Sequence, residues 1–451
     1  MNLSLKNLLV LLVCSGTLVL AGCKKSSSTN YDISVNTTGL IGSSVVVQLN
    51  STYNLTIPSD GTSTFTTQLS SGTVYDVVIT KQPSLPPQTC VLANANGTIT
   101  GNVSNVTLTC SPIEFAYLTN SNANSIMQLV IDQSTGALSQ NSGPVATGND
   151  PVAFAISQNG RYAFVVNQAD NTISAYLANT TLGLLVNAGN AIETNATLNG
   201  TPTAVAVDPL SQFVYVVNSG TSTVTGYSIN ATTGVLTCLG GSITACPSAP
   251  TATTGTAPSA LTFATQNGAE YLYVVNSGSG NISEYLMSST GALTPNGTAG
   301  AGNNPKAIAV TAVGGPFVFV VNESDATVSA YVVNAGVLGV NGSATSTGGL
   351  SPTSIAITPN GRFAYVTNSN STTNSIAEYS ISSSGILSYL GAVSTTISPD
   401  SITVEPTGQF AYVTSTTNNV TTYQIGSNGI LSALATQQLG NGPVSLVTAA
   451  N

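Results

Sequence analysis

The sequence contains no histidine and no tryptophan, and only 5% of its 451 residues are charged. Without histidine, the chain lacks the commonest general base and a frequent zinc ligand. Seven Lys/Arg residues stand against 16 Asp/Glu residues, which gives a net charge of −9. Since a nucleic-acid partner requires a basic surface that neutralises phosphates, we expect no nucleic-acid binding.

What replaces the missing charge is apolar and small polar residues. Hydrophobic residues make up 42% of the chain, and 43 glycines are dispersed along it. Intrinsic disorder requires low hydrophobicity and high net charge, so this composition argues against it. It predicts all-β structure with uncharged polar loops.

The first 22 residues have the pattern of a targeting segment. Lys6 precedes the apolar stretch LLVLLVCSGTLVLA, which is too short to be a typical membrane-spanning helix. The stretch ends in Leu20-Ala21-Gly22-Cys23, which resembles the lipobox of bacterial lipoproteins. We therefore expect residues 1–22 to be a lipoprotein signal peptide and Cys23 to carry the lipid, including palmitate. The alternative is an ordinary secretory signal with an unmodified cysteine.

Residues 23–30 are expected to form a short lipidated tether to the membrane, which is then a partner of the mature protein. Cys23 is followed by Lys24 and Lys25 and not by an Asp. By resemblance to enterobacterial lipoprotein sorting, this favours the outer membrane as the location in the bacterial cell envelope.

The remaining cysteines fall into two local pairs. Cys14 lies in the signal peptide, which leaves Cys90 with Cys110 and Cys238 with Cys246. An exported protein meets an oxidising environment, so two disulfides are predicted. A metal site is the alternative, but separate pairs without CxxC spacing and without histidine are poor zinc ligands. We predict no metal and no cofactor.

Residues 31–112 contain about seven short runs with alternating polarity, separated by Gly, Asp and Pro turns, which is typical of a small β-sandwich. The Cys90–Cys110 pair would connect its last strands. A spacer that lifts the rest of the chain from the membrane is favoured here over a binding role.

From 113 to 451 the chain repeats an apolar hexamer that usually ends in Asn. It occurs seven times, spaced by 47, 51, 58, 46, 46 and 47 residues: FAYLTN at 115, YAFVVN at 162, FVYVVN at 213, YLYVVN at 271, FVFVVN at 317, FAYVTN at 363 and FAYVTS at 410. Such a run is apolar on both faces of a strand, so both faces must be covered.

Two further signatures accompany the hexamer, a Pro-led run and a Gly-x-Leu triplet. The Pro-led runs begin at 151, 202, 258, 305, 352, 399 and 443. A period in the high forties with about four strands per unit predicts β-propeller blades. The Pro-led strand should be innermost and the hexamer second. Because the array ends with an unpartnered Pro-led run, residues 443–448 should pair with 115–120 and close a ring of seven blades.

The YVVN and YVTN hexamers with downstream TGxL resemble lactonase-type seven-bladed propellers, which include 6-phosphogluconolactonase-like enzymes and surface proteins with YVTN repeats. The resemblance covers about residues 113–451 and rests on residues of the blade core. It implies the fold directly and lactone hydrolysis as one activity of the family. The predicted fold class is therefore all-β, a seven-bladed β-propeller at 113–451 preceded by a small β-sandwich.

Blade topology places the turn after each hexamer and the segment before each Pro on one side, which we call the top face. The candidate binding residues on it are Asp150, Asn167, Asp170, Asn218, Lys306, Asn322, Glu323, Asp325 and Asn368. The asparagines either shape the following turn, which we favour, or bind a sugar. The carboxylates either are solvated, again favoured, or form a cation or polyol site. Lys306 either is solvated or binds an anionic group.

The expected function is a non-enzymatic binding or assembly role at the envelope, with a glycan or protein ligand on the top face. The propeller has 13 Asp/Glu residues against three Lys/Arg residues and no histidine, which disfavours catalysis on a phosphorylated substrate. No catalytic residue is assigned. The alternative is a lactonase-like hydrolase acting on a sugar lactone through Asp/Glu and Lys306. A purely structural surface-coat protein is a third interpretation.

Overall fold

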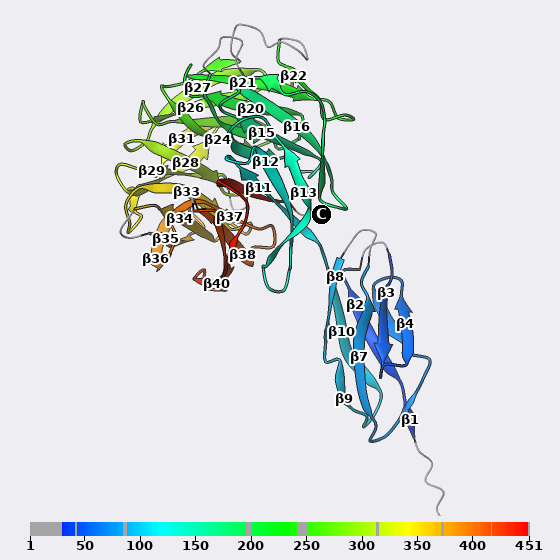
Figure 1. Ribbon diagram of the computed structural model, residues 1–451. Coiled ribbons are helices and arrows are strands. Elements are labelled where there is room, and N and C mark those ends of the chain that lie inside the picture. Colours follow the sequence, from blue (N-terminus) through cyan, green and yellow to red (C-terminus); the bar gives the residue numbers. More distant parts are fainter. Residues whose placement is uncertain are drawn as a thin grey trace, which may run out of the picture. The chain divides into compact units, whose positions relative to one another are not determined.

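The computed structural model describes residues 29–40, 43–83, 88–194, 200–240, 251–312, 315–370, 374–415 and 417–449. None of these residues is helical, and they are organised into short β-strands (Figure 1). Accordingly, the described part of the chain offers no long apolar helix for crossing a membrane. The predicted signal peptide, tether and lipidated Cys23 lie outside the described residues.

The chain divides into two compact units. The first unit falls within Met1–Thr38, Val45–Lys81 and Val91–Thr109, and the second takes Gly39–Ser44, Gln82–Cys90 and Cys110–Asn451.

The N-terminal strands form two four-stranded sheets. One sheet has the order β5-β2-β10-β8 and the other β4-β3-β7-β9, while β1 pairs with β6. The strand bounds are β1 (Asn30–Tyr31), β2 (Ile33–Thr38), β3 (Val45–Leu49), β4 (Tyr53–Ile57), β5 (Gly61–Thr64), β6 (Leu69–Ser70), β7 (Val74–Lys81), β8 (Gln88–Ala93), β9 (Asn96–Thr98) and β10 (Val103–Pro112).

Alternate residues are buried in β2, β3 and the first half of β7, which is the pattern of sheets with one apolar face. Val45, Val47 and Leu49 of β3 are buried, and the residues between them are partly exposed. A disulfide joins Cys90 of β8 to Cys110 of the neighbouring β10, as the sequence predicts. The small β-sandwich expected before the propeller is therefore present.

The described residues from Glu114 onward form seven separate sheets, one for each repeat. The first blade is β41 (Pro443–Ala449), β11 (Glu114–Asn120), β12 (Ser125–Ile131) and β13 (Leu138–Ala146). The second is β14 (Pro151–Ile156), β15 (Tyr162–Asn167), β16 (Thr172–Asn179) and β17 (Leu184–Asn187), with β18 (Ile192–Glu193) beside β16. The third is β19 (Pro202–Val207), β20 (Phe213–Asn218), β21 (Thr223–Ile229) and β22 (Leu236–Cys238), with β23 (Ala252–Thr253) beside β21.

The fourth blade is β24 (Pro258–Gln266), β25 (Ala269–Asn276), β26 (Asn281–Met287) and β27 (Leu293–Gly300). The fifth is β28 (Pro305–Val310), β29 (Phe317–Asn322), β30 (Thr327–Asn334) and β31 (Val337–Val340), with β32 (Thr345–Ser346) beside β30. The sixth is β33 (Pro352–Ile357), β34 (Phe363–Asn368), β35 (Ser375–Ile381) and β36 (Leu387–Ser394). The seventh is β37 (Pro399–Val404), β38 (Phe410–Ser415), β39 (Asn419–Ile425) and β40 (Leu431–Gln438).

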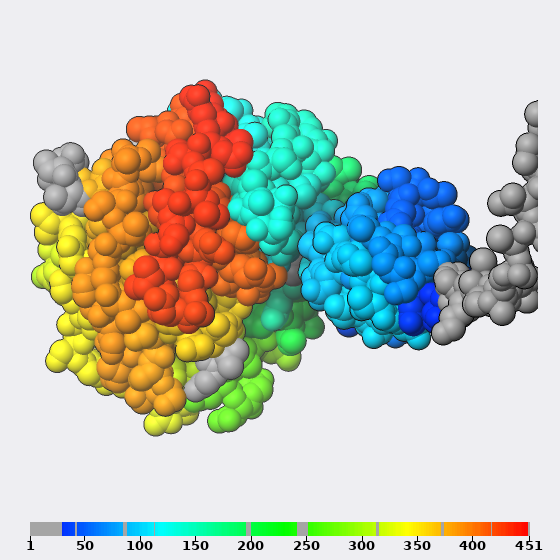
Figure 2. Space-filling model, turned by 90° about the horizontal axis from the view of Figure 1, so that it is seen from below, coloured from blue at the N-terminus to red at the C-terminus, as the bar shows by residue number. Residues whose placement is uncertain are grey.

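The Pro-led strands form the inner ring of the propeller. Each contacts the Pro-led strand of the next blade, from β14 through β19, β24, β28, β33 and β37 to β41 and back to β14. Closure uses both ends of the array, as predicted. Phe115 pairs with Ala449 and Leu118 with Leu446 in antiparallel register, and the red C-terminal residues lie against the cyan first blade (Figure 2).

The hexamer strands lie inside the sheets and are covered on both faces. All six residues of β15, β20, β29, β34 and β38 are buried. Covering both faces explains why these strands carry apolar residues in succession instead of alternating.

The Gly-x-Leu glycines allow close packing between neighbouring blades. Gly136 of the first blade has φ +69°, and a Cβ there would lie 2.5 Å from Cδ1 of Phe410 in the seventh blade. Tyr412 of the same blade donates its hydroxyl to the Gly136 carbonyl at 2.9 Å. An aromatic ring thus packs directly on backbone, which only glycine permits.

Of the second predicted disulfide, only Cys238 lies among the described residues. Cys238 ends β22, is buried and is disulfide-bonded. Cys246, its predicted partner, lies outside the described residues.

Candidate functional site

The repeated asparagines at the ends of the hexamer strands are fully buried. Asn167, Asn218, Asn322 and Asn368 all have no solvent-exposed surface. In the second blade, Asn167 accepts a hydrogen bond from the Gly148 amide at 3.0 Å and donates to Thr172 and Ser174 at 3.0 and 2.9 Å. Because these side chains hold the strand ends inside the blades, they do not present amides to a sugar. The structural interpretation fits them, and sugar binding does not.

Two of the predicted carboxylates clamp top-face loops. Asp170 accepts hydrogen bonds from the backbone and side-chain nitrogens of Asn149 at 2.7 and 2.8 Å. Asp325 makes the same two bonds with Asn303, and these bonds lower its pKa. The two residues belong to the second and fifth blades, so the structure does not bring them together as one cation or polyol site.

Lys306 and Glu323 do form a cluster on the top face. The Lys306 ammonium lies 3.3 Å from Oε2 of Glu323, and the side-chain amide of Asn304 donates to the same oxygen at 2.6 Å. Lys306 remains 42% exposed, so a ligand can reach its amine. Asp150, which precedes Pro151 as Asn304 precedes Pro305, occupies the equivalent position of the second blade.

Lys306 belongs to a ring of residues that directly follow the seven inner-strand prolines. Its members are Val152, Thr203, Ser259, Lys306, Thr353, Asp400 and Val444. The hydroxyl of Thr203 donates to the Pro258 carbonyl at 3.0 Å, and that of Ser259 donates to the Pro305 carbonyl at 3.0 Å. These bonds cross from one inner strand to the next, so the ring of residues lies at the top end of the inner strands, which we call the top mouth of the propeller.

Asp400 is a candidate that the sequence reasoning missed. It is half-buried at the start of β37, and burial raises the pKa of its carboxyl group. The available signal was Pro399-Asp400, which is the repeat-equivalent of Pro305-Lys306. The ring therefore carries an amine in the fifth blade and a carboxyl group in the seventh, with Thr353 in the blade between them.

This combination of groups can support hydrolysis of a carbonyl compound. A carboxylate can take a proton from water, and the raised pKa of Asp400 makes its carboxylate a stronger base than a solvated one. An ammonium group can stabilise the negative oxygen that develops when water attacks a carbonyl. The described residues contain no group of three or more His, Cys, Asp or Glu side chains suited to a metal ion.

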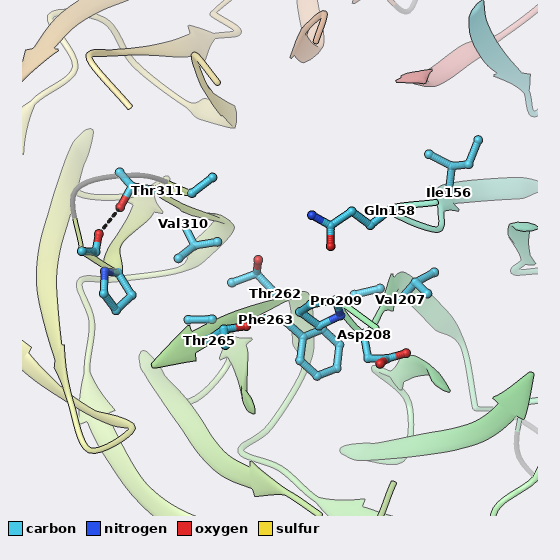
Figure 3. A pocket seen from close by; sticks show the side chains of 15 residues that line it. Ile156, Gln158, Val207, Asp208, Pro209, Thr262, Phe263, Thr265, Val310 and Thr311 are labelled. Atoms are coloured by element: carbon cyan, nitrogen blue, oxygen red, sulfur yellow. Dashed lines mark hydrogen bonds between the residues drawn. The ribbon is translucent and has the colours of Figure 1, made fainter. Parts of the chain in front are cut away.

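The opposite face of the propeller carries a cavity of about 620 Å³ where the inner strands end (Figure 3). Asp208 lines it but is buried, and it accepts hydrogen bonds from the backbone amides of Leu210, Gln212 and Phe213. The hydroxyl groups of Ser157 and Thr358 likewise accept a hydrogen bond from the backbone amide of the first residue of the next strand. Asp208 is therefore a turn-stabilising residue and a poor catalytic base.

A family model described as "Lactonase, 7-bladed beta-propeller" matches residues 86–199 and 314–448, more than half of the chain. No curated protein matches the sequence.

Several solved structures resemble the propeller. A candidate 6-phosphogluconolactonase from Bacteroides uniformis has a TM-score of 0.64 at 18% identity, covering 74% of this chain and 99% of its own. A second candidate, from Bacteroides fragilis, has a TM-score of 0.60 at 19% identity, with 74% and 98% covered. The periplasmic gluconolactonase of Pseudomonas aeruginosa has a TM-score of 0.59 at 17% identity, with 75% and 99% covered.

At these identities the structural likeness shows the fold alone, whereas the family model rests on the sequence itself. The seven sheets of the propeller agree with the seven-bladed β-propeller that its description states. The chain therefore belongs to the family of lactonase-type seven-bladed β-propellers.

Proposed function

We propose that the propeller hydrolyses a sugar lactone at its top mouth. The observation that carries this proposal is that Lys306 and Asp400 hold equivalent positions on the ring of inner strands, two blades apart. Family membership and the fold of a gluconolactonase lend support. The non-enzymatic binding role expected from the sequence has no such support.

The reaction needs one base and one group that stabilises the oxyanion. Ionised Asp400 accepts a proton from water while the water oxygen bonds to the lactone carbonyl carbon. The Lys306 ammonium stabilises the resulting oxyanion, and Glu323 holds the amine in place at 3.3 Å. When the tetrahedral species collapses, the ring carbon–oxygen bond breaks, and Asp400 returns the proton to the departing oxygen. The product is the open hydroxy acid.

The charge around the mouth favours an uncharged lactone. Of the three Lys/Arg residues in the propeller, Lys306 alone lies on the top face, while Arg161 and Arg362 lie in turns on the opposite face. Asp150, Asp170, Glu323, Asp325 and Asp400 are on the top side as well. A dianionic phosphate ester would meet one amine, already paired with Glu323, in an acidic surrounding.

We also propose that this activity is held at the bacterial envelope, on the outer membrane, by lipid on Cys23. The support is the Leu20-Ala21-Gly22-Cys23 sequence after an apolar segment. Radiolabelled palmitate incorporation into the wild-type chain, and its loss in Cys23→Ala, tests the anchor. Equal labelling of both chains, or labelling of neither, would contradict it.

The proposed activity is tested with D-glucono-1,5-lactone and the full chain purified in detergent, by following acid release with a pH indicator. Asp400→Asn should lower kcat/KM by about 100-fold, the usual contribution of a general base. Lys306→Met should lower it by a similar or larger factor, about 100-fold or more.

The matched controls are Asp76→Asn and Lys81→Met, which change the same residue types on β7 of the N-terminal unit and should leave the rate unchanged. The proposal fails if the wild-type chain does not exceed spontaneous hydrolysis, or if Asp400→Asn and Lys306→Met retain the wild-type rate.

A further inference from the structure

The cavity on the opposite face is open to solvent and is lined by residues of four consecutive blades, the second to the fifth. Its volume of about 620 Å³ lies within the usual range for small-molecule sites. The walls come from the ends of the inner strands and the turns that follow them, including Ile156, Val207 and Val310 (Figure 3). It lies at the other end of these strands from Lys306, so it is separate from the proposed lactone site.

The fourth blade builds one wall of this cavity in a way that the other blades do not. Its inner strand β24 has nine residues, whereas β14, β19, β28, β33 and β37 have six. The extra residues of β24 continue the pairing with β25 up to the pair Gln266 and Ala269. Asn267 and Gly268, both in left-handed conformation, form the turn between the two strands. The Gln266 side chain donates to the Val333 carbonyl at 2.8 Å, which fixes the longer hairpin to the fifth blade.

Three polar side chains on the cavity wall have hydrogen-bonding capacity to spare. Gln158 and Thr265 are exposed and Thr262 is half-buried, and none makes a side-chain hydrogen bond to another described residue. Figure 3 shows the Gln158 amide and the Thr262 hydroxyl pointing into the same open space. Thr311, by contrast, donates to the Gly315 carbonyl and accepts from the Phe317 amide. Gln158, Thr262 and Thr265 are therefore the groups that can bind a ligand.

The cavity wall offers no available charge among its described residues. The carboxylate of Asp208 is engaged by backbone amides. Arg161 does not line the cavity, and its guanidinium lies 5.6 Å from the centre of the Tyr162 ring. A charged ligand would lose its hydration without gaining an opposite charge, so the site selects an uncharged one.

We propose that this cavity binds a neutral saccharide of one or two rings. The Gln158 amide and two threonine hydroxyls can donate to and accept from sugar hydroxyl groups. The aliphatic wall of Ile156, Val207 and Val310 can cover the apolar CH face of a ring. The binding site is independent of lactone hydrolysis at the top mouth.

The test is isothermal titration calorimetry of the full chain with cellobiose, a neutral disaccharide, and with glucuronate as the charged probe. Saturable cellobiose binding is expected, with glucuronate at least tenfold weaker. Gln158→Ala and Thr262→Val should each weaken cellobiose binding by about five- to tenfold, the usual effect of losing one hydrogen bond. Gln158 is exposed, so its replacement leaves the fold intact.

Thr403→Val is the matched control. Thr403 occupies the same position of the seventh-blade inner strand as Thr262 does in the fourth, but it does not line the cavity. The affinity for cellobiose should be unchanged in this variant and in Lys306→Met. Gln158→Ala should hydrolyse the lactone at the same rate as wild type. The proposal is overturned if wild type binds no cellobiose, if glucuronate binds equally well, or if Gln158→Ala and Thr262→Val bind like Thr403→Val.

Discussion

Replacing Gly136 with alanine tests the packing between the seventh and first blades. Gly136 begins the Gly-x-Leu triplet before β13, and its φ of +69° is a conformation that alanine adopts at a cost. The added Cβ would lie 2.5 Å from Cδ1 and 2.8 Å from Cγ of Phe410. Phe410 is buried in β38, so its ring cannot move aside freely.

Two contributions add to the loss in free energy of unfolding. The left-handed backbone costs an alanine about 1–2 kcal/mol. Forcing an extra methyl group into a packed core costs about 1–3 kcal/mol more. We therefore expect Gly136→Ala to destabilise the propeller by about 2–5 kcal/mol, the sum of these two ranges.

Gly268→Ala separates the two contributions within the same propeller. Gly268 has φ +78°, but a Cβ there would have no neighbour within 4 Å. It should therefore lose only the backbone term, about 1–2 kcal/mol.

Urea unfolding followed by tyrosine fluorescence measures both variants, since the chain has 17 tyrosines and no tryptophan. If Gly136→Ala unfolds at the same urea concentration as Gly268→Ala, the contact between Phe410 and Gly136 does not hold the blades together.

Three further predictions concern the disulfide, a buried carboxyl group and ring closure. Replacing Cys90 and Cys110 by serine should lower the free energy of unfolding by about 3 kcal/mol, given their separation of 20 residues. A reductant should lower the urea midpoint of wild type, and an equally large decrease in the double variant would contradict this prediction. Burial and the neighbouring Glu405 raise the pKa of Glu114 from 4.5 to about 8. Because the Glu114 carboxyl group loses its proton at lower pH in the unfolded chain than in the folded one, the free energy of unfolding should fall as pH rises between these two values. Glu114→Gln should weaken the accompanying decline in melting temperature, and the same dependence of melting temperature on pH in the variant and in wild type would refute this. Deleting 443–451 should leave β11 without its inner partner and abolish the cooperative unfolding of the propeller in calorimetry, whereas a wild-type transition would contradict closure.

Much of the fold could be predicted because the blade core is a repeated local pattern. FVYVVN at 213–218 must be covered on both faces, and the last Pro-led run has one free partner strand, β11. These constraints arise from period and burial, which a single sequence displays. The exceptional hairpin of the fourth blade was also visible in principle, since Asn267-Gly268 replaces the longer turn seen in the other blades.

The site was harder to predict because it depends on which polar groups are left unsatisfied. The terminal asparagines look available in the sequence, yet Asn167 is buried and bonded on several sides. In the sequence, Asp170 and Asp325 look free to bind a ligand. In the structure, each carboxylate accepts hydrogen bonds from an asparagine of a neighbouring loop. Asp400 looks like an ordinary strand residue until the inner strands are placed in a ring. Such distinctions require three-dimensional neighbours.

The central claim is that the top mouth of this propeller hydrolyses a lactone, and steady-state hydrolysis of D-glucono-1,5-lactone tests it most directly. The account predicts wild-type turnover well above the spontaneous rate and its loss in the Lys306→Met/Asp400→Asn double variant. Turnover that survives in the double variant, or a wild-type rate equal to that of buffer alone, would contradict it.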